Sequence, residues 1–262
     1  MGLIIDQAQR KRGIIMGVSA AMIIKDSERC IERCLDSILT AVDEIIVVDT
    51  GSTDRTVGIL ETYSRRYGHV KLHHFKWTND FSAARNFSLS KVTKDWVFVV
   101  DSDDVLPAED HGKIREYTNR MDEQGKKCVF DIIYDNTVDG KIVETIPVGY
   151  VRLFPSSLRF QDKIHEQIVY YPLERIQSDI HLLHDGYDFN QIDLRVKKKR
   201  NIDLLIQSLQ EDQENARLWM HLGREMIGLD NDKATRYLNI AESKAKSPEM
   251  LEWIRKSKLE MS

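Results

Sequence analysis

The chain has few cysteines and no apolar stretch long enough to cross a membrane. Only 3 of its 262 residues are cysteine, and Cys30 and Cys34 are spaced as on adjacent turns of a helix, which favours reduced thiols over a disulfide framework. The longest apolar run, residues 13–24, is shorter than the roughly 18 residues of a spanning helix. We therefore expect a cytoplasmic protein without a transmembrane segment.

An excess of positive charge is also missing. The 38 Lys and Arg residues against 42 Asp and Glu residues leave a net charge of −4, so nucleic acid is not an expected partner. With 42% hydrophobic residues, 31% charged residues, 13 Gly and 5 Pro, the composition excludes collagen-like, low-complexity and disordered chains. The length suits either one large domain or one medium-sized domain with an appendage.

The apolar run near the amino terminus has two interpretations. It follows the basic residues 10–12 and contains Ser19, Ala20 and Ala21, which gives it the outline of a signal peptide. A helical pattern and a second apolar strand follow directly, however, and that second strand needs a partner. We therefore interpret residues 18–24 as the buried first strand of a sheet.

Strand and helix patterns alternate over the first hundred residues, as in βαβ units around a parallel sheet. Apolar residues recur at helical spacing in residues 27–39, and the same periodicity predicts helices at 53–67 and 82–90. Strands are predicted at 18–24, 44–49, 70–75 and 96–101. Beyond Asp104 we expect a helix over 107–124, then a mixed or antiparallel extension with strands at 129–134, 141–146, 150–154 and 176–183, and finally helices from Asn190 onward.

Two carboxylates follow the strand predicted at 96–101. Residues two apart on an extended chain point to the same side, so Asp101 and Asp103 are expected to face one spot while Ser102 turns away. Two convergent carboxylates at the carboxyl end of a strand suit a hard divalent cation. The alternative is an acidic loop in which Ser102 or Asp104 caps the helix near Pro107.

A second polar cluster ends the strand predicted at 44–49. The carboxyl ends of parallel strands meet at one edge of a sheet, where open α/β proteins bind ligands. Gly51 permits a tight turn there, and Ser52 or Thr53 can cap the next helix. Asp49 is not needed for that cap, so it remains available to accept hydrogen bonds from a nucleoside.

Three motifs in this order resemble family 2 of the glycosyltransferases, which have the GT-A fold: EIIVVDTGSTDRT at 44–56, FSAARN at 81–86 and WVFVVDSDD at 96–104. The resemblance implies an α/β protein in which a GT-A (Rossmann-like mixed sheet) catalytic domain over residues 1–190 is followed by a small all-α helical tail over residues 191–262. The Gln-x-x-Arg-Trp signature of processive members is absent, so one sugar is expected for each binding event.

The resemblance also assigns roles by position. Asp49 matches the uracil-binding aspartate, Asp101 the residue at the ribose or diphosphate, and Asp103 the metal-binding carboxylate, with Mn²⁺ or Mg²⁺ as the implied cofactor. Ser102 belongs to the same donor-binding group. Asp104 stands where the family usually has Glu, a departure that leaves metal binding intact.

Further donor-binding and metal-binding residues follow from the same comparison. Lys25 and Asp26 match the end of the first strand that flanks the base. Arg85 lies where a guanidinium can reach a diphosphate in fork geometry, the alternative being an ion pair with an acidic loop residue such as Asp80. His184 aligns with a histidine that joins the metal or diphosphate, although a single histidine is more often structural.

The segment RLFPSSLRFQDKIHEQI at 152–168 resembles the acceptor side of the family. An inverting transfer needs a base near the acceptor. Glu166 is the first candidate for that base and His165 the second. The alternative is that Glu166 only anchors a loop by hydrogen bonds.

The tail resembles one tetratricopeptide repeat, shortened by a residue at its turn, at Trp219, Leu222, Gly223, Ala234, Leu238 and Ala241. One repeat cannot bury its faces alone, so it is expected to pack on the catalytic domain or on a second subunit in a homodimer. The basic run at 195–200 suits phosphates or an acidic acceptor, but a solvated helix face is the preferred interpretation.

The leading hypothesis is therefore an inverting, non-processive, metal-dependent glycosyltransferase that uses a UDP-sugar. The tail and residues 76–86 are most similar to sublancin-type peptide S-glycosyltransferases, which modify a cysteine or serine of a bacteriocin precursor. Transfer to a cell-surface glycan or lipid is the alternative, and a non-catalytic peptide-binding scaffold is a second one. A sugar-phosphate nucleotidyltransferase would need a Gly-rich phosphate loop near the first strand, which is missing.

Overall fold

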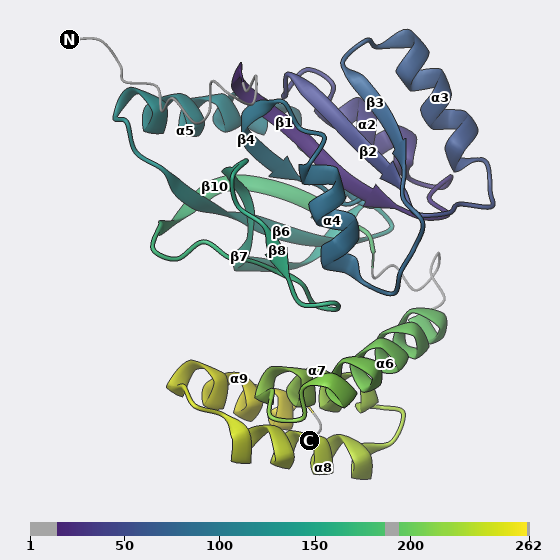
Figure 1. Cartoon of the computed structure of the whole chain (residues 1–262), viewed down its shortest axis with the longest axis vertical. Coiled ribbons are helices and arrows are strands. Elements are labelled where there is room, and N and C mark those ends of the chain that lie inside the picture. Colours follow the sequence, from purple (N-terminus) through teal and green to yellow (C-terminus); the bar gives the residue numbers. More distant parts are fainter. Residues whose placement is uncertain (1–14, 187–193, 261–262) are drawn as a thin grey trace. The chain divides into compact units, whose positions relative to one another are not determined.

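The computed structural model describes residues 15–186 and 194–260, which form two compact units (Figure 1). The sheet unit consists of Met1–Asp162 and Glu166–Ile192, and the helical unit consists of Lys163–His165 and Asp193–Ser262. The domain boundary predicted between residues 190 and 191 lies outside the described residues, and so do the basic residues 10–12.

An eight-stranded sheet with the order β3-β2-β1-β4-β7-β6-β10-β5 forms the sheet unit. Its first half is parallel, as predicted: β1 (Ile15–Ile24) pairs with β2 (Glu44–Asp49) and β4 (Lys94–Val99), and β2 pairs with β3 (Val70–His74). β1, β2 and β4 contain the buried apolar runs of the sequence, whereas β3 at the edge of the sheet is only partly buried. Their carboxyl ends therefore share one edge of the sheet.

The second half of the sheet is mixed. β7 (Lys141–Pro155) runs antiparallel to β4 and β6 (Cys128–Val138), whereas β10 (Glu174–His184) is parallel to β6 and pairs with the short β5 (Asp104–Val105). Two strands were predicted where β7 is one. The ladder between β7 and β6 continues past Pro147 through a register shift. The two backbones approach closely there, since a Cβ on Gly149 would lie 1.6 Å from the carbonyl oxygen of Ile132.

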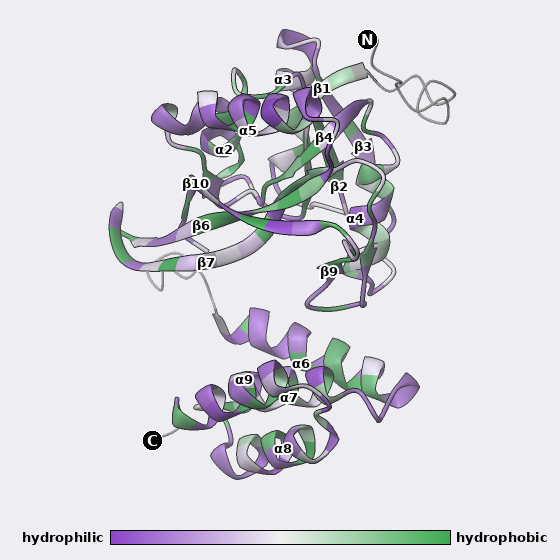
Figure 2. Ribbon diagram, turned by 90° about the vertical axis from the view of Figure 1, so that its left-hand side faces the viewer, coloured by the Kyte–Doolittle hydropathy of each residue, from purple (hydrophilic) through white to green (hydrophobic). Residues whose placement is uncertain are grey.

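Helices cover both faces of the sheet. α2 (Ile31–Ile38), α3 (Thr56–Arg66) and α5 (His111–Glu123), which follows the short η1 (Ala108–Asp110), pack over a core that includes Trp96 and Phe98 of β4. The alternate residues Val97 and Val99 face α4 (Phe81–Leu89) and the two-stranded sheet of β8 (Phe160–Gln161) and β9 (Gln167–Ile168). Figure 2 shows hydrophobic residues gathered on the strands inside the sheet unit.

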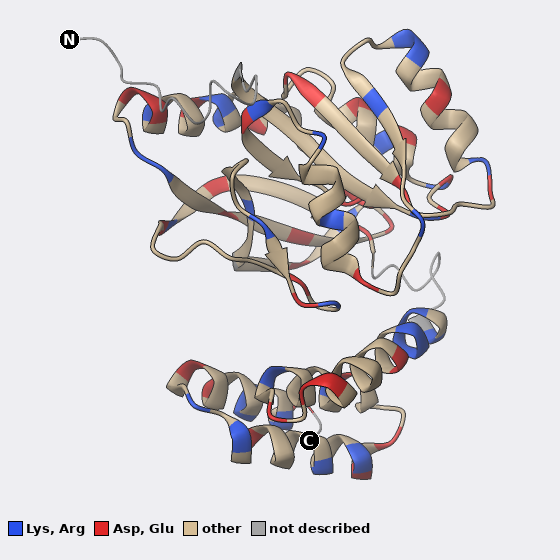
Figure 3. Ribbon diagram, in the orientation of Figure 1, with Lys and Arg blue, Asp and Glu red and all other residues tan. Residues whose placement is uncertain are grey.

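The helical unit contains α6 (Leu194–Glu211), α7 (Ala216–Met226), α8 (Asn231–Lys244) and α9 (Pro248–Leu259). Its core consists of Met220, Leu238, Ala241 and Ile254. Gly223 lets α7 approach α8 closely, because a Cβ at this position would lie 2.7 Å from the side chain of Leu238. Basic residues gather in the first turns of α6 (Figure 3), and no helix in the described part of the chain has the length and apolar character to span a membrane.

Candidate active site

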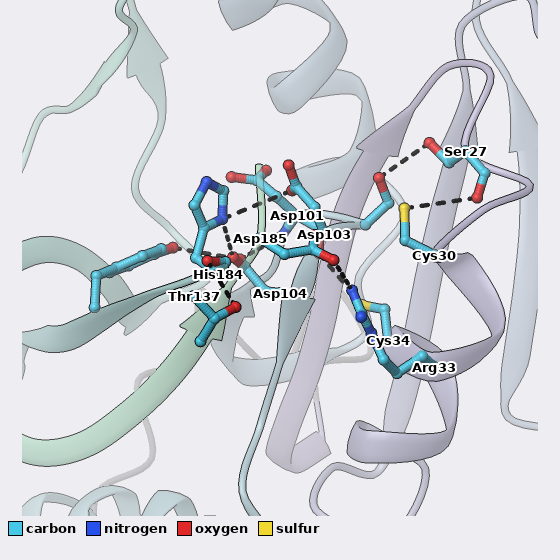
Figure 4. A network of polar contacts seen from close by, with 12 residues as sticks. Ser27, Cys30, Arg33, Cys34, Asp101, Asp103, Asp104, Thr137, His184 and Asp185 are labelled. Atoms are coloured by element: carbon cyan, nitrogen blue, oxygen red, sulfur yellow. Dashed lines mark hydrogen bonds and ion pairs between the residues drawn. The ribbon is translucent and has the colours of Figure 1, made fainter. Parts of the chain in front are cut away.

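Three segments meet at the carboxyl edge of the sheet (Figure 4). The loop after β4 carries Asp101, Ser102 and Asp103, and β5 and β10 pair so that Asp104 lies opposite His184. β4 ends at Val99, so the loop turns where an extended chain was expected. Asp101 and Asp103 consequently have different partners.

Asp103, Asp104 and His184 form the group that can hold a metal ion among residues 15–186 and 194–260, with ligand atoms all within 4.8 Å of one another. Nδ1 of His184 lies 2.8 Å from Oδ1 of Asp104 and 3.9 Å from Oδ1 of Asp103. Although burial lowers the pKa of His184, the hydrogen bond to Asp104 and the charge of Asp103 outweigh that effect and raise it.

The position of Gly186 shows where the side chains of Asp103 and His184 converge. A Cβ at this residue would lie 2.3 Å from Oδ2 of Asp103 and 2.4 Å from Nε2 of His184. Both atoms therefore border the same small space, which only a glycine leaves open. One carboxylate oxygen and one imidazole nitrogen around that space match the donor set of a divalent transition metal such as Mn²⁺.

Asp104 is a supporting residue in this arrangement. It is fully buried, and its Oδ2 accepts hydrogen bonds from the backbone N–H of Asp101 at 2.8 Å and from the hydroxyl of Tyr134 at 3.3 Å. Ser102 bonds through its hydroxyl to Ser27 at 3.0 Å. Neither Ser102 nor Asp104 caps the helix near Pro107, so the alternative of a capping loop is wrong.

A clamp of two arginines fixes the end of β10. Asp185 accepts hydrogen bonds from Arg29 at 2.8 and 3.1 Å and from Arg33 at 2.7 Å. Burial raises the pKa of Asp185, but the two guanidinium groups outweigh it and lower the pKa. The clamp ties the residue after His184 to the first helix.

The three free cysteines are buried, in keeping with the prediction of reduced thiols. Burial raises the pKa of the Cys34 thiol well above its ordinary value, so the thiol stays protonated. Its Sγ lies 3.3 Å from the carbonyl oxygen of Asp101, to which it donates a hydrogen bond.

Asp101 is held by two arginines. Its Oδ1 lies 2.6 Å from Nη2 of Arg85, and its Oδ2 lies 2.8 Å from Nη2 of Arg152. Burial raises the pKa of Asp101, but the charges of Arg152 and Arg85 outweigh it and hold the pKa far below the usual range. Asp101 is therefore an anion locked in place.

Arg85 joins Asp101 to the acceptor-side segment. Its Nε donates to Oε1 of Glu166 at 3.0 Å, while Nη1 is buried and has no hydrogen-bond partner among the described residues. The alternative of an ion pair with an acidic loop residue is found, but the partner is Asp101 and not Asp80, which caps α4 through the N–H of Ala83 at 2.9 Å. One donor of Arg85 thus remains for a ligand.

The residues expected to bind the nucleobase of the donor lie at the ends of β1 and β2. Asp49 accepts hydrogen bonds from the backbone N–H groups of Gly51 and Ser52, both at 3.1 Å. Oδ1 of Asp26 accepts a hydrogen bond from the N–H of Thr53 at 2.7 Å, and Nζ of Lys25 lies 3.9 Å from Oδ2 of Asp26. Ser52 and Thr53 do not cap α3, which begins only at Thr56.

His165, the second candidate for the catalytic base, is not among these residues of the sheet unit. It belongs to the helical unit, where its ring stacks on His221 with centroids 3.8 Å apart. Burial and nearby cations, Arg217 first among them, lower the pKa of His165 to about 4.

The sequence interpretation assigned no role to Arg152, Asp185 or Gly186. Arg152 stands in the segment 152–168 and the other two directly follow His184, so their nearness to recognised motifs was the available signal. Their partners are distant along the chain, 51 residues for the pair of Arg152 and Asp101. Spacing alone does not reveal such contacts.

Known proteins resemble this chain in sequence. The model of the family described as glycosyl transferase family 2 matches residues 19–184. The SPbeta prophage-derived glycosyltransferase SunS of Bacillus subtilis is 28% identical over 220 residues, which are 82% of this chain and 50% of SunS. A TPR repeat-containing protein of Synechococcus elongatus is 35% identical over 151 residues, 58% of this chain and 35% of that protein. The chain thus spans half or less of these relatives.

Solved structures share the GT-A fold. S. aureus TarS 1–349 superposes with a TM-score of 0.52 at 17% identity, over 94% of this chain and 89% of that chain. Its complex with UDP-GlcNAc gives a TM-score of 0.52 at 15% identity, with the same coverage. The mannosyltransferase PcManGT from Pyrobaculum calidifontis, in complex with GDP-Man and Mn²⁺, gives 0.51 at 13% identity, over 95% of this chain and 88% of that chain.

Proposed function

Because this chain belongs to glycosyl transferase family 2 and is a glycosyltransferase, we propose that it moves one sugar from a UDP-sugar to a cysteine or serine of a peptide. The transfer inverts the anomeric carbon and uses Mn²⁺ or Mg²⁺. The observation that carries the proposal is the convergence of Asp103 Oδ2 and His184 Nε2 beside Gly186, at the ligand edge of the sheet.

Asp49, Lys25 and Asp26 would hold the nucleoside. Oδ2 of Asp49 accepts bonds from the N–H groups of Gly51 and Ser52, whereas Oδ1 accepts one bond, from Ser52, and has a second lone pair for a base or ribose donor. The loop bonds also fix the direction of that carboxylate. UDP and UDP-GlcNAc bound to TarS, a protein of the same fold, support a UDP-sugar donor.

Asp103 and His184 would hold the metal ion, with Asp104 orienting the imidazole. A divalent cation held by these residues would supply positive charge to neutralise the departing diphosphate. The Mn²⁺ in the PcManGT complex supports a metal-dependent transfer. Nη1 of Arg85, which is buried without a partner in the described part of the chain, would donate to a diphosphate oxygen.

Glu166 would act as the general base that removes the proton of the acceptor. Arg85 ties it to Asp101, so the base lies beside the donor loop. In-line attack on the anomeric carbon from the face opposite the diphosphate inverts its configuration. The lack of the processive signature fits release after one transfer.

The acceptor part of the proposal rests on the likeness to SunS and on a helical unit of tetratricopeptide type. It is tested by measuring UDP release from UDP-glucose, UDP-GlcNAc and UDP-galactose with Mn²⁺ or Mg²⁺. Synthetic peptides that differ only in one cysteine or serine serve as acceptors, and mass spectrometry locates the added hexose. Asp103→Asn is the inactive control.

Metal-dependent, peptide-stimulated UDP release with a glycosylated peptide as product supports the proposal. UDP release stimulated only by glycans or lipids would overturn the peptide acceptor. A wild-type protein that binds neither UDP nor any UDP-sugar would overturn the donor assignment, and with it the enzyme function proposed for this site.

A further inference from the structure

Asp185 stands between two residues of the proposed metal site. His184 before it supplies Nε2, and Gly186 after it leaves open the space that this atom shares with Oδ2 of Asp103. Asp185 itself is only 7% exposed, although it is charged and follows the last residue of β10. A carboxylate buried to this extent needs partners of opposite charge.

Two arginines about one helical turn apart supply that charge. Arg29, in the turn before α2, donates through Nη1 and Nη2 to both carboxylate oxygens of Asp185, in the fork geometry of a strong ion pair. Arg33, in the first turn of α2, adds a third hydrogen bond at 2.7 Å (Figure 4). The carboxylate therefore ties the end of β10 to a helix more than 150 residues away in sequence, since the pairs are separated by 156 and 152 positions.

The backbone around Asp185 is held as well. Its N–H donates to the carbonyl oxygen of Asp103 at 3.2 Å, and Oγ1 of Thr137 donates to the carbonyl oxygen of His184 at 3.3 Å. The first of these bonds joins the two segments that supply the ligand atoms. Asp185 thus connects the end of β10, the loop after β4 and α2.

α2 also holds the loop that carries Asp103. Near the start of that loop, Sγ of Cys34 lies 3.3 Å from the carbonyl oxygen of Asp101, and beyond its end the N–H of Leu106 donates to Oγ of Ser37 at 3.1 Å. One helix is therefore the common support of both segments of the proposed metal site.

Such support matters because metal–ligand distances are fixed to within about 0.2 Å. Local opening of a fold costs least at the ends of elements and in loops. His184 is the last residue of its strand, and Asp103 lies in a loop. The ion pairs of Asp185 oppose opening at the residue next to one ligand, and its backbone bond carries that restraint to the other.

We propose that Asp185, held by Arg29 and Arg33, is a positioning residue of the metal site: it keeps the ligand atoms of Asp103 and His184 at the separation that the ion requires. The inference rests on the proposed function in one respect, the binding of Mn²⁺ by those two ligands. It gives α2, which lies outside the three motifs of the sequence, a part in that binding.

The test measures Mn²⁺ affinity by electron paramagnetic resonance of the free ion, so no turnover is needed. The variants of the full chain are Asp185→Asn, the double variant Arg29→Ala/Arg33→Ala and the triple variant that combines them. The triple variant leaves no buried unpaired charge, so it remains measurable if one of the others unfolds. Thermal unfolding measures the stability of each variant, and calorimetry with UDP in EDTA measures nucleotide binding without metal.

Asp43→Asn is the matched control. Asp43 also holds an arginine by two hydrogen bonds, from Arg115 at 2.9 and 3.1 Å. It precedes β2, however, and so lies at the amino end of the strand rather than at the carboxyl edge of the metal site. Its replacement should lower stability and leave the Mn²⁺ affinity unchanged.

We expect Asp185→Asn to weaken Mn²⁺ binding about 10-fold, with the Kd for metal-free UDP unchanged. Arg29→Ala/Arg33→Ala should weaken it as well. This second loss is decisive, because removing two positive charges near the site would by itself strengthen cation binding. The triple variant should lose no more than Asp185→Asn, since all three changes break one contact.

Three results would overturn the inference: wild-type Mn²⁺ affinity in the folded double or triple variant, losses that multiply in the triple variant, or an equal loss in Asp43→Asn. The proposed metal site fails separately. A wild-type protein that binds no Mn²⁺ would remove the site itself, before any variant is compared.

Discussion

Oδ1 of Asp104 lies 2.8 Å from Nδ1 of His184, in a position where Asp104 is fully buried. A histidine that donates through Nδ1 presents the lone pair of Nε2, and this is the atom that converges with Asp103 beside Gly186. Asp104 also accepts the backbone N–H of Asp101. One carboxylate therefore orients both the imidazole and the loop of the proposed metal site.

Replacement of Asp104 by Asn should weaken Mn²⁺ binding about 10- to 100-fold, because the amide can turn its NH₂ group toward Nδ1 and select the wrong tautomer of His184. Electron paramagnetic resonance of free Mn²⁺ measures the affinity without any turnover. Asp179→Asn, at an exposed carboxylate, is the matched control. Unchanged Mn²⁺ affinity in Asp104→Asn would show that the bond does not tune the site.

Gly186→Ala should abolish detectable Mn²⁺ binding, since the new methyl group would lie 2.3 Å from Oδ2 of Asp103 and 2.4 Å from Nε2 of His184. The control is Gly112→Ala, which meets no atom within 4 Å and sits in α5. That change should stabilise the fold by about 0.5–1 kcal/mol. The convergence of the two ligand atoms would be wrong if Gly186→Ala bound Mn²⁺ as the wild type does.

Asp49→Ala should weaken UDP binding about 10-fold both with and without Mn²⁺, because its proposed role is hydrogen bonding to the nucleoside. Asp54→Ala is the control, since Asp54 also bonds to loop N–H groups, at Thr56 and Glu28. Calorimetry with UDP decides the matter. A loss seen only in the presence of metal would move Asp49 to the metal site.

Glu166→Gln keeps the shape of the side chain and removes its basicity, so kcat should fall by about 10²- to 10⁴-fold while the Kd for UDP stays constant. A thiol is already a few per cent ionised near neutral pH, so with a cysteine peptide the loss should shrink as pH rises. A serine peptide gives no such rescue. Profiles of kcat against pH for the two matched peptides test the base and the acceptor together.

The stacked pair of histidines should make the helical unit sensitive to acid. Burial and neighbouring charges lower the pKa of His165 to about 4 and that of His221 well below 6.5. Between about pH 6.5 and pH 4 the unfolded chain therefore binds more protons than the folded chain, so stability falls as pH falls. For His165 alone the loss is on the order of 3 kcal/mol across this window.

Chemical denaturation at pH 7.5, 6 and 5 measures this effect, with the double variant His165→Phe/His221→Phe as the reference. Arg200, Arg217, Arg224, Lys197 and Glu225 surround the pair and are retained in both proteins. The wild type should lose more stability than the double variant as pH falls. Parallel curves would show that the two rings titrate as exposed histidines.

Most of the larger elements could be predicted from the sequence because their patterns are local. The strand predicted at 44–49 is β2 to the residue, since four successive β-branched residues between two carboxylates favour a short buried strand. The two-residue strands β5, β8 and β9 have no pattern of their own. Their pairing depends on tertiary contacts.

The candidate site shows the same division. Asp49, Asp101 and Asp103 lie at the carboxyl ends of strands predicted to be parallel, so topology predicted that they share an edge, whereas His184 was assigned by the family resemblance. The direction of each side chain was not predictable, because it depends on partners such as Arg152 and Arg29 that lie elsewhere in the chain. His165 illustrates this, since it adjoins Glu166 in sequence but stacks on His221 of the helical unit.

The cluster of Arg85, Arg152, Asp101 and Glu166 contains two positive and two negative charges in contact. The four residues therefore cannot be redesigned one at a time. Exchanging one of them leaves an unbalanced charge in a buried place, whereas exchanging an oppositely charged pair keeps the group neutral. Libraries that aim at new acceptors should for that reason vary these four codons in compensating pairs, and single-site libraries will undersample the workable solutions.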